Sequence, residues 1–223
     1  GYASIPKFSK ISVAPIDLRQ TLTKLIEKEI ANAQAGKPAS IKIKINSLVD
    51  AEMILLLYKA SMAGVKIDLN VRGICCLKPN LPGISENIRV ISIVGRFLEH
   101  SRIYYFENNG NPKIFLSSAD LMPRNLNRRV EILFPIEDPD LKNKIIHILD
   151  IIFRDNHNAR LLLPDGKYIR LAPKKNEPRF SSQRYFREEI LKEFEEKERN
   201  KEEKRRSLFQ PLTNFEQIIQ SKN

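Results

Sequence analysis

The sequence predicts an α/β fold in which a mixed sheet is flanked by helices and followed by a charged helical tail. One observation is a strand–helix–strand pattern over 40–71, with Gly64 after the helix, which is typical of a parallel βαβ unit. A second is a pair of β-branched and aromatic runs on either side of the turn residues 108–110. A third is a change to charged composition after Pro173.

The first part of the chain alternates between strands and helices. Ser40 to Ile45 alternates apolar and polar residues with period two, as a half-buried strand does. Asp17 and Asp50 are the predicted N-caps of two helices, and a glycine follows the end of each. The predicted elements are, in order, a strand over 11–14, a helix over 18–35, a strand over 40–45, a helix over 51–63 and a strand over 65–71.

The second part continues with strands after a loop that contains Pro79, Pro82 and Gly83. Two strands meet at the turn Asn108-Asn109-Gly110, and Asp138-Pro139 begins a helix. The predicted elements are a loop over 73–87, a strand over 88–94, the two strands around the turn, a strand over 130–134, a helix from 139 to about 153 and a short strand pair around 165–166.

The chain is predicted to comprise a domain over 1–173 and a charged tail over 174–223, helical or partly disordered. Residues 184–206 mix both charges, and opposite charges spaced four residues apart favour an exposed helix. Such a helix is either simply solvated or a docking arm.

Composition limits the function classes. The 223 residues, 42% of them hydrophobic, can bury a proper core. The net charge of +11 points to polyanionic partners, whether nucleotide, polyphosphate, nucleic acid or an acidic membrane face, unless the excess is only a solvated surface.

Only two cysteines occur, and they are the neighbours Cys75 and Cys76. This spacing is unlike that of a disulfide scaffold or a zinc site, so we expect no metal ligands of that kind and a reducing, cytoplasmic location. No run of eighteen apolar residues predicts a transmembrane segment.

The stretch 96–125 carries the most chemistry. It contains the triplet His100-Ser101-Arg102, then Glu107 after four further residues, and it includes Ser117-Ser118-Ala119-Asp120. An imidazole beside cations, with hydroxyls and acids nearby, can handle a phosphoryl group: the imidazole acts as nucleophile or acid/base, and guanidinium groups neutralise phosphate oxygens. The alternative is two amphipathic strands with ordinary surface charges.

Strand alternation places His100 and Arg102 on one face, about 7 Å apart, so both could touch one phosphate. A hydrogen-bonded structural histidine is the alternative for His100. His147 in an apolar helix and His157 in a polar loop are interpreted as structural.

Arg72 follows the strand over 65–71. In open α/β sheets, ligands gather at the carboxyl ends of strands, so Arg72 is a candidate anion clamp, or else a surface arginine. Ser118 and Asp120 follow another strand and can line the same pocket, with Asn125 nearby.

Arg129 and Glu131 are expected on one face of the strand over 130–134. They either hold and orient phosphate or form an ion pair worth under about 1 kcal/mol. The sequence has no Walker-A loop and no G-x-G-x-x-G, so side chains would hold the phosphate. Mg²⁺ is expected to arrive with the nucleotide.

Four segments then resemble the carboxyl-terminal part of the bacterial polyphosphate kinase family, which has phospholipase D-like α/β domains. The resemblance runs from about Val13 to Pro173, and the charged tail lies outside it. The segments are NSLVDAEMI (46–54), YKASMAGVKIDLNVRGICCL (58–77), SENIRVISIVGRFLEHSRIYYF (85–106) and LSSADLMPRNLNRRVEILFPI (116–136).

The resemblance implies a transferase that reversibly moves the terminal phosphate of ATP to inorganic polyphosphate, with Mg²⁺ and through a phosphorylated histidine. It implies that His100 is a second essential imidazole, an acid/base or phosphate contact near the leaving group. It also implies that the nucleotide and phosphates are faced by Arg72, Arg129 and Glu131 and, by extension, by Arg102, Ser118, Asp120 and Asn125.

The family's phosphoacceptor histidine lies in a preceding phospholipase D-like domain, and none of the three histidines here occupies that place. We therefore expect an isolated last domain of a longer cytoplasmic enzyme, either free or peripheral to the inner membrane. Its expected partners are ATP or ADP, polyphosphate, the preceding domains and other subunits of a homo-oligomer, with no specific nucleic acid.

Two alternatives stay open. The phospholipase D pattern is H-x-K, four residues, Asp, then G-S-x-N, and here it reads His100-x-Arg102, four residues, Glu107, then Ser117-Ser118-x-Asp120. These departures disfavour a stand-alone phosphodiesterase or nuclease. A non-catalytic nucleic-acid-binding module fits the charge, but the strands lack an interleaved aromatic platform.

Overall fold

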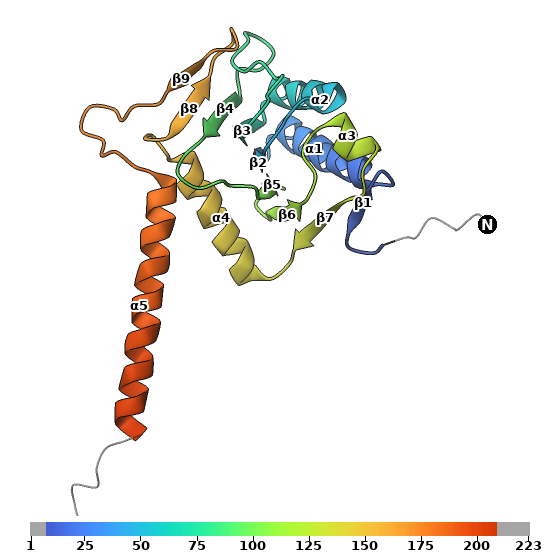
Figure 1. Ribbon diagram of the computed structural model, residues 1–223. Helices are drawn as coiled ribbons and strands as arrows, with labels where there is room; N and C mark the ends of the chain where they lie inside the picture. The colour runs from blue at the N-terminus through green and yellow to red at the C-terminus, as the bar shows by residue number, and fades with distance from the viewer. Residues whose placement is uncertain (1–7, 209–223) are drawn as a thin grey trace, which may run out of the picture. The chain divides into compact units, whose positions relative to one another are not determined.

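A single mixed sheet forms the centre of the compact unit that ends at Ser182 (Figure 1). Within residues 8–208, which the computed structural model describes, nine strands pair in the order β1-β7-β6-β5-β2-β3-β4-β8-β9. Strands β2, β3 and β4 are parallel, and the remaining pairings are antiparallel. The strands are β1 (Ser12–Ala14), β2 (Ser40–Ile45), β3 (Lys66–Val71), β4 (Ile88–Ile93), β5 (Arg102–Phe106), β6 (Lys113–Ser117), β7 (Glu131–Ile136), β8 (Ala159–Leu162) and β9 (Tyr168–Arg170).

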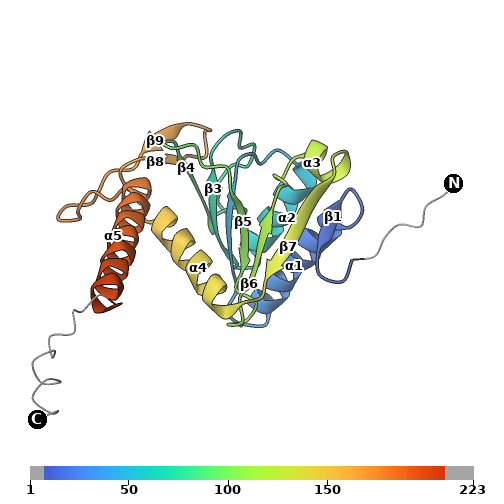
Figure 2. The ribbon, with the colours of Figure 1, turned by 60° about the horizontal axis from the view of Figure 1, so that its bottom comes forward.

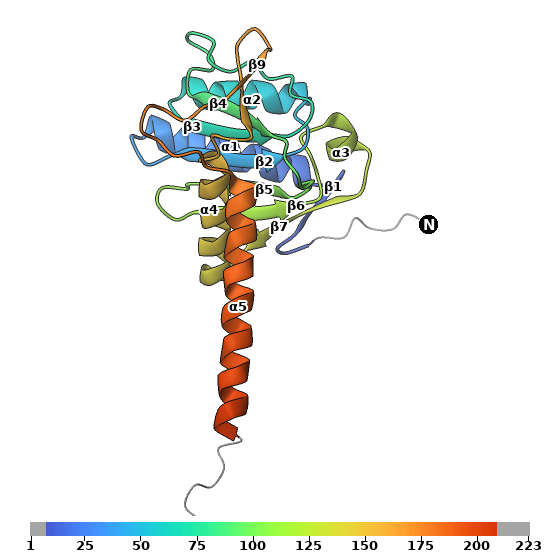
Figure 3. The ribbon, with the colours of Figure 1, turned by 60° about the vertical axis from the view of Figure 1, so that its left-hand side comes forward.

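Helices cover both faces of this sheet. Helices α1 and α2 lie on one face and α4 lies on the other, as Figures 2 and 3 show from two directions. The mixed α/β fold predicted from the sequence is therefore confirmed. The helices are α1 (Leu18–Gln34), α2 (Ala51–Met62), α3 (Pro123–Asn127), α4 (Pro139–Phe153) and α5 (Ser182–Leu208).

The alternation of β2 decides which of its side chains enter the main core. Ile41, Ile43 and Ile45 are buried in the cluster beneath α1 and α2. Lys42 points to the other face, where its Nζ lies 2.7 Å from Asp150 of α4. Because side chains alternate along a strand, Lys44 lies on the same face as Lys42.

Helix ends follow the predicted capping in two of three cases. Asp50 accepts a hydrogen bond from the Met53 amide, and Asp138 accepts one from the Leu141 amide. Asp17 stands at the N-cap position of α1, but its side chain accepts from the Val13 amide at 2.7 Å. Asp17 therefore occupies the predicted N-cap position without a capping hydrogen bond from its side chain, because the preceding strand supplies a competing donor.

The predicted turn between β5 and β6 is confirmed. Asn108, Asn109 and Gly110 have φ of 49°, 55° and 80°, a left-handed region that asparagine and glycine tolerate better than other residues. Helix α3 was not predicted, because five residues are too few to show a helical period.

Asp155, which follows α4, gathers a group of backbone amides. Its Oδ1 accepts from the amides of residues 157–159, and its Oδ2 accepts from Ser182 N and Ser182 Oγ, both at 2.8 Å.

The chain divides into two compact units after Ser182.

Helix α5 confirms the exposed helix predicted over 184–206. Its surface carries the expected charge pairs, of which Arg184 with Glu188 is the tightest i,i+4 example at 2.7 Å. None of the helices within residues 8–208 combines the length and apolar character needed to cross a membrane.

A partly buried ion pair joins the first two helices. The Arg19 guanidinium donates to both carboxylate oxygens of Asp50, at 2.9 and 2.6 Å, and also to the exposed Glu52. Burial raises the pKa of the Asp50 carboxyl, but hydrogen bonds from Arg19 and the Met53 amide outweigh it, and the pKa lies below its ordinary value of 3.8.

We expect Asp50→Asn to lower the free energy of unfolding by about 1–3 kcal/mol at neutral pH, because asparagine keeps the helix cap but loses the ion pair. A carboxyl with a lowered folded-state pKa stabilises the protein above its ordinary pKa, and this stabilisation is lost as the pH falls through the folded pKa. The difference between the variant and the original chain should therefore shrink below about pH 4. Denaturant unfolding at several pH values measures it.

Glu52→Gln is the matched control, because Glu52 also pairs with Arg19 but its side chain is 78% exposed. It should change the unfolding free energy little at any pH. A loss in Asp50→Asn that stayed constant down to pH 3 would contradict the role given to the charge.

Candidate functional site

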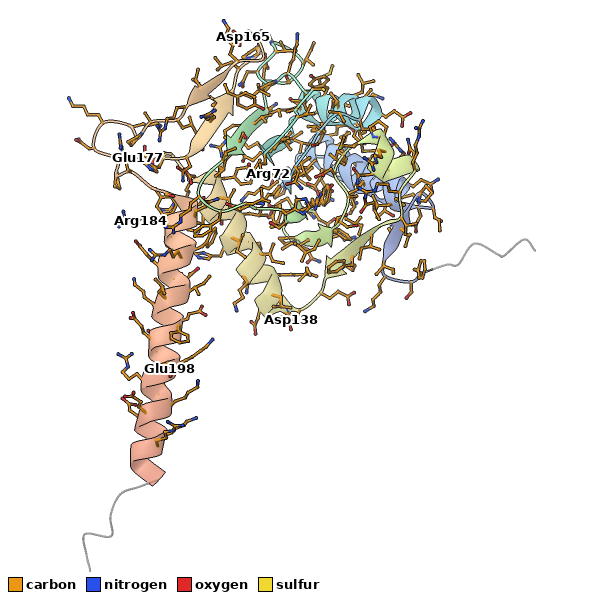
Figure 4. All side chains as sticks on the ribbon, viewed as in Figure 1. Arg72, Asp138, Asp165, Glu177, Arg184 and Glu198 are labelled. Carbon is orange, nitrogen blue, oxygen red and sulfur yellow. The ribbon has the colours of Figure 1, made fainter. Side chains whose placement is uncertain are left out.

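Polar side chains gather where β2 and β3 end and β5 begins. Because β5 runs antiparallel to β2, its first residue, Arg102, lies at the edge where β2 finishes. The antiparallel pairing of β5 with β6 places Arg102 opposite Ser117, the last residue of β6. Asn46 and Arg72 directly follow the parallel strands β2 and β3. Arg72, labelled in Figure 4, thus lies at the end of β3, which is a central strand of the sheet.

The carboxylate of Asp120 is the centre of this group. Its Oδ1 accepts from Asn46 N at 2.7 Å and from Asn46 Nδ2 at 3.3 Å. The Arg102 guanidinium binds both oxygens, with Nε 3.2 Å from Oδ1 and Nη2 3.0 Å from Oδ2. Asp120 is 6% exposed, so this bidentate pair is shielded from solvent.

Asn46 links Arg72 to Asp120. The Arg72 Nε donates to Asn46 Oδ1 at 3.0 Å, and the amide of Gly73 donates to the Asn46 carbonyl at 2.8 Å. A Cβ on residue 73 would lie 2.8 Å from that carbonyl oxygen, so only glycine lets the loop approach this closely. Sequence reasoning missed Asn46, although its place after a strand is the signal that identified Arg72.

His100 lies just before β5, in the segment 99–101. The prediction that it shares a strand face with Arg102 is wrong, because the strand begins at Arg102. The two residues still meet: Arg102 Nη1 lies 3.1 Å from His100 Nδ1 and 3.0 Å from His100 O. Arginine can only donate, so Nδ1 accepts and the proton of the neutral imidazole is on Nε2.

Glu131 is the centre of a second group. It accepts hydrogen bonds from Ser118 Oγ and Asn125 Nδ2, and Arg129 Nη1 lies 3.8 Å from its Oε1. The Glu131 side chain is 9% exposed, whereas that of Arg129 is 55% exposed. Arg129 precedes β7, so the pair does not share a strand face as predicted.

The two groups meet around Tyr104. Its hydroxyl donates to the Ala119 carbonyl at 2.9 Å. Ala119 lies between Ser118 of one group and Asp120 of the other. Burial raises the pKa of Tyr104, and the charges of Asp120 and Glu131 raise it further, so the phenol stays protonated and keeps donating.

Lys44 is a site residue that sequence reasoning missed. Its Nζ lies 2.9 Å from Ser101 Oγ and 3.4 Å from Glu99 Oε2. Burial lowers the pKa of the amine, Glu99 opposes the shift, and Arg72 and Arg102 reinforce it. The alternating sequence of β2 predicts only a strand and does not show what Lys44 contacts.

Glu107 does not join the site. It follows the other end of β5, where it accepts from Tyr105 Oη at 2.7 Å and Ser40 Oγ at 3.3 Å. The carboxylate that meets the imidazole–arginine pair is Asp120 instead. His147 lies on α4, and His157 lies in the turn held by Asp155.

A cavity of about 300 Å³ lies near the same end of β5 as Glu107. None of the residues discussed above for the site lines this cavity. The lining residues are Thr21, Lys24, Leu25, Lys28, Glu29, Phe106, Asn108, Lys113 and Phe115.

A mixed α/β sheet with an imidazole and several guanidinium groups at one edge defines a domain suited to binding anions. The family model described as polyphosphate kinase C-terminal domain 2 matches residues 11–183. The chain belongs to this family, and the resemblance found in the sequence is confirmed.

Relatives and a solved structure agree. The polyphosphate kinase of Lactiplantibacillus plantarum is 48% identical over 188 residues, which are 84% of this chain and 26% of that protein. Polyphosphate kinase 1 of Chlorobaculum tepidum is 50% identical over 83% of this chain and 26% of its own length. The crystal structure of polyphosphate kinase from Porphyromonas gingivalis has a TM-score of 0.82 and 42% identity, covering 86% of this chain and 30% of that one. The chain thus spans about a quarter of the length of the curated relatives it matches.

We expect Asp120→Ala to lower the free energy of unfolding by about 3–5 kcal/mol, because it leaves the buried Arg102 charge and the Asn46 amide without their acceptor. Arg72→Ala should change it by less than about 1 kcal/mol, since Arg72 is half-buried and makes one side-chain hydrogen bond within the described residues. Denaturant unfolding separates the two. Equal losses would mean that Arg72 is a structural residue.

Proposed function

We propose that this chain is the part of a polyphosphate kinase that holds nucleotide and phosphate groups while the terminal phosphate of ATP is transferred reversibly to inorganic polyphosphate. The observation that carries the proposal is the contact of His100 with Arg102, at the sheet edge where Arg72 is held by Asn46, in a chain of this family. Phosphoryl transfer depends mainly on positioning and on stabilising charge, which such a group supplies.

The contacts suggest two kinds of residue. Arg72 is held through Nε, so its terminal nitrogens are left to donate to phosphate oxygens, and the half-exposed Arg129 is likewise accessible. Arg102, Ser118, Asp120 and Asn125, which were expected to contact phosphate, each hydrogen-bond to another protein group. We assign these four to the framework that orients Arg72, His100 and Arg129, with Glu131 holding Arg129.

His100 would act as a phosphate contact near the leaving group. Its Nδ1 accepts from Arg102, so the Nε2–H of the neutral ring can donate a hydrogen bond to the β-phosphate oxygen of the departing ADP while the ring keeps its proton, and the same hydrogen bond serves the reverse transfer. The phosphoacceptor histidine of the phosphorylated intermediate would lie in a different domain of the whole protein.

Magnesium would enter as part of the nucleotide complex, where it neutralises phosphate charge. The described residues bring no three His, Cys, Asp or Glu side chains together in a metal-binding group. The carboxylates of the site, Asp120 and Glu131, already accept hydrogen bonds from protein donors. This site by itself therefore does not fit a resident metal.

We also propose, from family membership, that the whole protein is a cytoplasmic homo-oligomer, either free or peripheral to the inner membrane. Its other domains would contact this one. The sheet edge that carries His100 is the expected place, because the reacting phosphate must reach both histidines.

Binding should depend on the two accessible arginines. We expect Arg72→Ala and Arg129→Ala each to weaken binding of magnesium-ATP and of long-chain polyphosphate by about 10- to 100-fold, the loss of a charge-assisted hydrogen bond. Calorimetric titration at matched salt measures this. Lys66→Ala is the control, because it removes an exposed charge at the opposite end of β3 from Arg72.

A DNA oligonucleotide of equal charge distinguishes the binding-module alternative. If the chain is a phosphate site of the proposed kind, ATP and polyphosphate compete for it, and DNA displaces them poorly. Equal affinity for DNA that is indifferent to Arg129→Ala would contradict the proposal and leave only a basic surface.

The 223-residue chain by itself should bind these ligands and yet make no polyphosphate from ATP, since it would lack the phosphoacceptor. Incubation with γ-labelled ATP tests both product and covalent label. Polyphosphate synthesis, with a labelled phosphohistidine recovered from the chain, would overturn this expectation. Hydrolysis of bis-p-nitrophenyl phosphate without ATP would favour a phosphodiesterase instead.

A further inference from the structure

One buried lysine holds the His100 segment from both sides. Only 5% of the Lys44 side chain is exposed. Its Nζ lies 2.9 Å from Ser101 Oγ, 3.3 Å from Ser101 O and 3.4 Å from Glu99 Oε2. An ammonium group has three N–H donors, so these three acceptors match its full capacity. Burying the charge is costly, and this arrangement compensates for it.

Both partners of Lys44 are chain neighbours of His100. The segment 99–101 lies outside the β5 ladder, which begins at Arg102, and residues 94–98 before it are exposed. The segment therefore needs an anchor other than the sheet. Lys44 is on β2, next to β5 and near the middle of the sheet, and it provides a rigid one.

Arg102 and Lys44 constrain different parts of the His100 segment. Arg102 contacts the imidazole at Nδ1 and the carbonyl of the same residue. Lys44 contacts the residues on either side, so it constrains the backbone from which the imidazole projects. Without Lys44, the ring keeps one partner while its backbone gains freedom.

We propose that Lys44 is a positioning residue, which sets the backbone of His100 and thereby the direction in which the imidazole Nε2 faces the phosphate site. The catalytic consequence rests on the proposed function of His100. The effect on the imidazole itself does not depend on that function, and it can be measured without substrate.

Lys44→Met tests the proposal, because methionine fills similar space without the charge or the donors. Lys42→Met is the matched control: Lys42 lies two residues earlier on the same face of β2, and it pairs with Asp150 of α4 instead. Nitrogen-15 spectra of the histidine side chains, with His100→Gln for assignment, report the tautomer of each ring. Melting curves of every variant confirm that it is folded.

In the original chain and in Lys42→Met, we expect His100 to show one neutral tautomer, with the proton on Nε2. In Lys44→Met, its nitrogen signals should move toward the average of both tautomers, as in a free imidazole. Ser101→Ala, which removes one acceptor of Lys44 from an exposed position, should give a smaller shift in the same direction and decides the question if Lys44→Met fails to fold. Unchanged His100 signals in the folded variants would overturn the proposal.

The catalytic arm uses a complete polyphosphate kinase that contains this domain. Lys44→Met should lower kcat by about 10- to 100-fold with little change in KM for ATP, because a small misplacement of a reacting group is costly. It should have little further effect in a His100→Gln background. A shifted tautomer with full activity would refute the function proposed for His100 while leaving its positioning by Lys44 supported. Equal losses in both backgrounds would overturn the positioning role.

Discussion

The pairing of Asp120 with Arg102 is the interaction on which the rest of the site depends. A shielded carboxylate that binds a guanidinium through both oxygens fixes that guanidinium in one orientation. The remaining nitrogen of Arg102 then holds the imidazole of His100, and the same carboxylate reaches Arg72 through Asn46. One buried carboxylate thus fixes the orientation of Arg102 directly, and it fixes His100 and Arg72 through Arg102 and Asn46.

The mixed sheet makes this convergence possible. Parallel strands deliver Asn46 and Arg72 to one edge at their carboxyl ends, and the antiparallel strand β5 delivers Arg102 to the same edge at its beginning. A purely parallel neighbour would have carried Arg102 to the opposite side. The site therefore combines rigid framework groups with accessible arginines, an arrangement that pre-organises donors for a highly charged ligand.

Much of the fold could be predicted from local pattern, and each failure has its own physical reason. The strands, the βαβ unit, the Asp50 cap and the turn at 108–110 depend on neighbouring residues, and all are confirmed. Helix α3 is too short for a periodic signal. Glu107 was grouped with His100 because it is close in sequence, yet β5 is extended and separates the two by its full length.

The sequence by itself determined the α/β class, the family, and the residue types that suit phosphate, with Arg72, His100 and Arg129 among them. Only the tertiary structure decided how these groups are held. Asn46 and Asp120 are 74 residues apart in the chain, and Lys44 and Ser101 are 57 apart. Strand register sets such contacts through the packing of the whole sheet, so no local pattern distinguishes a lysine that faces solvent from one that contacts Glu99 and Ser101.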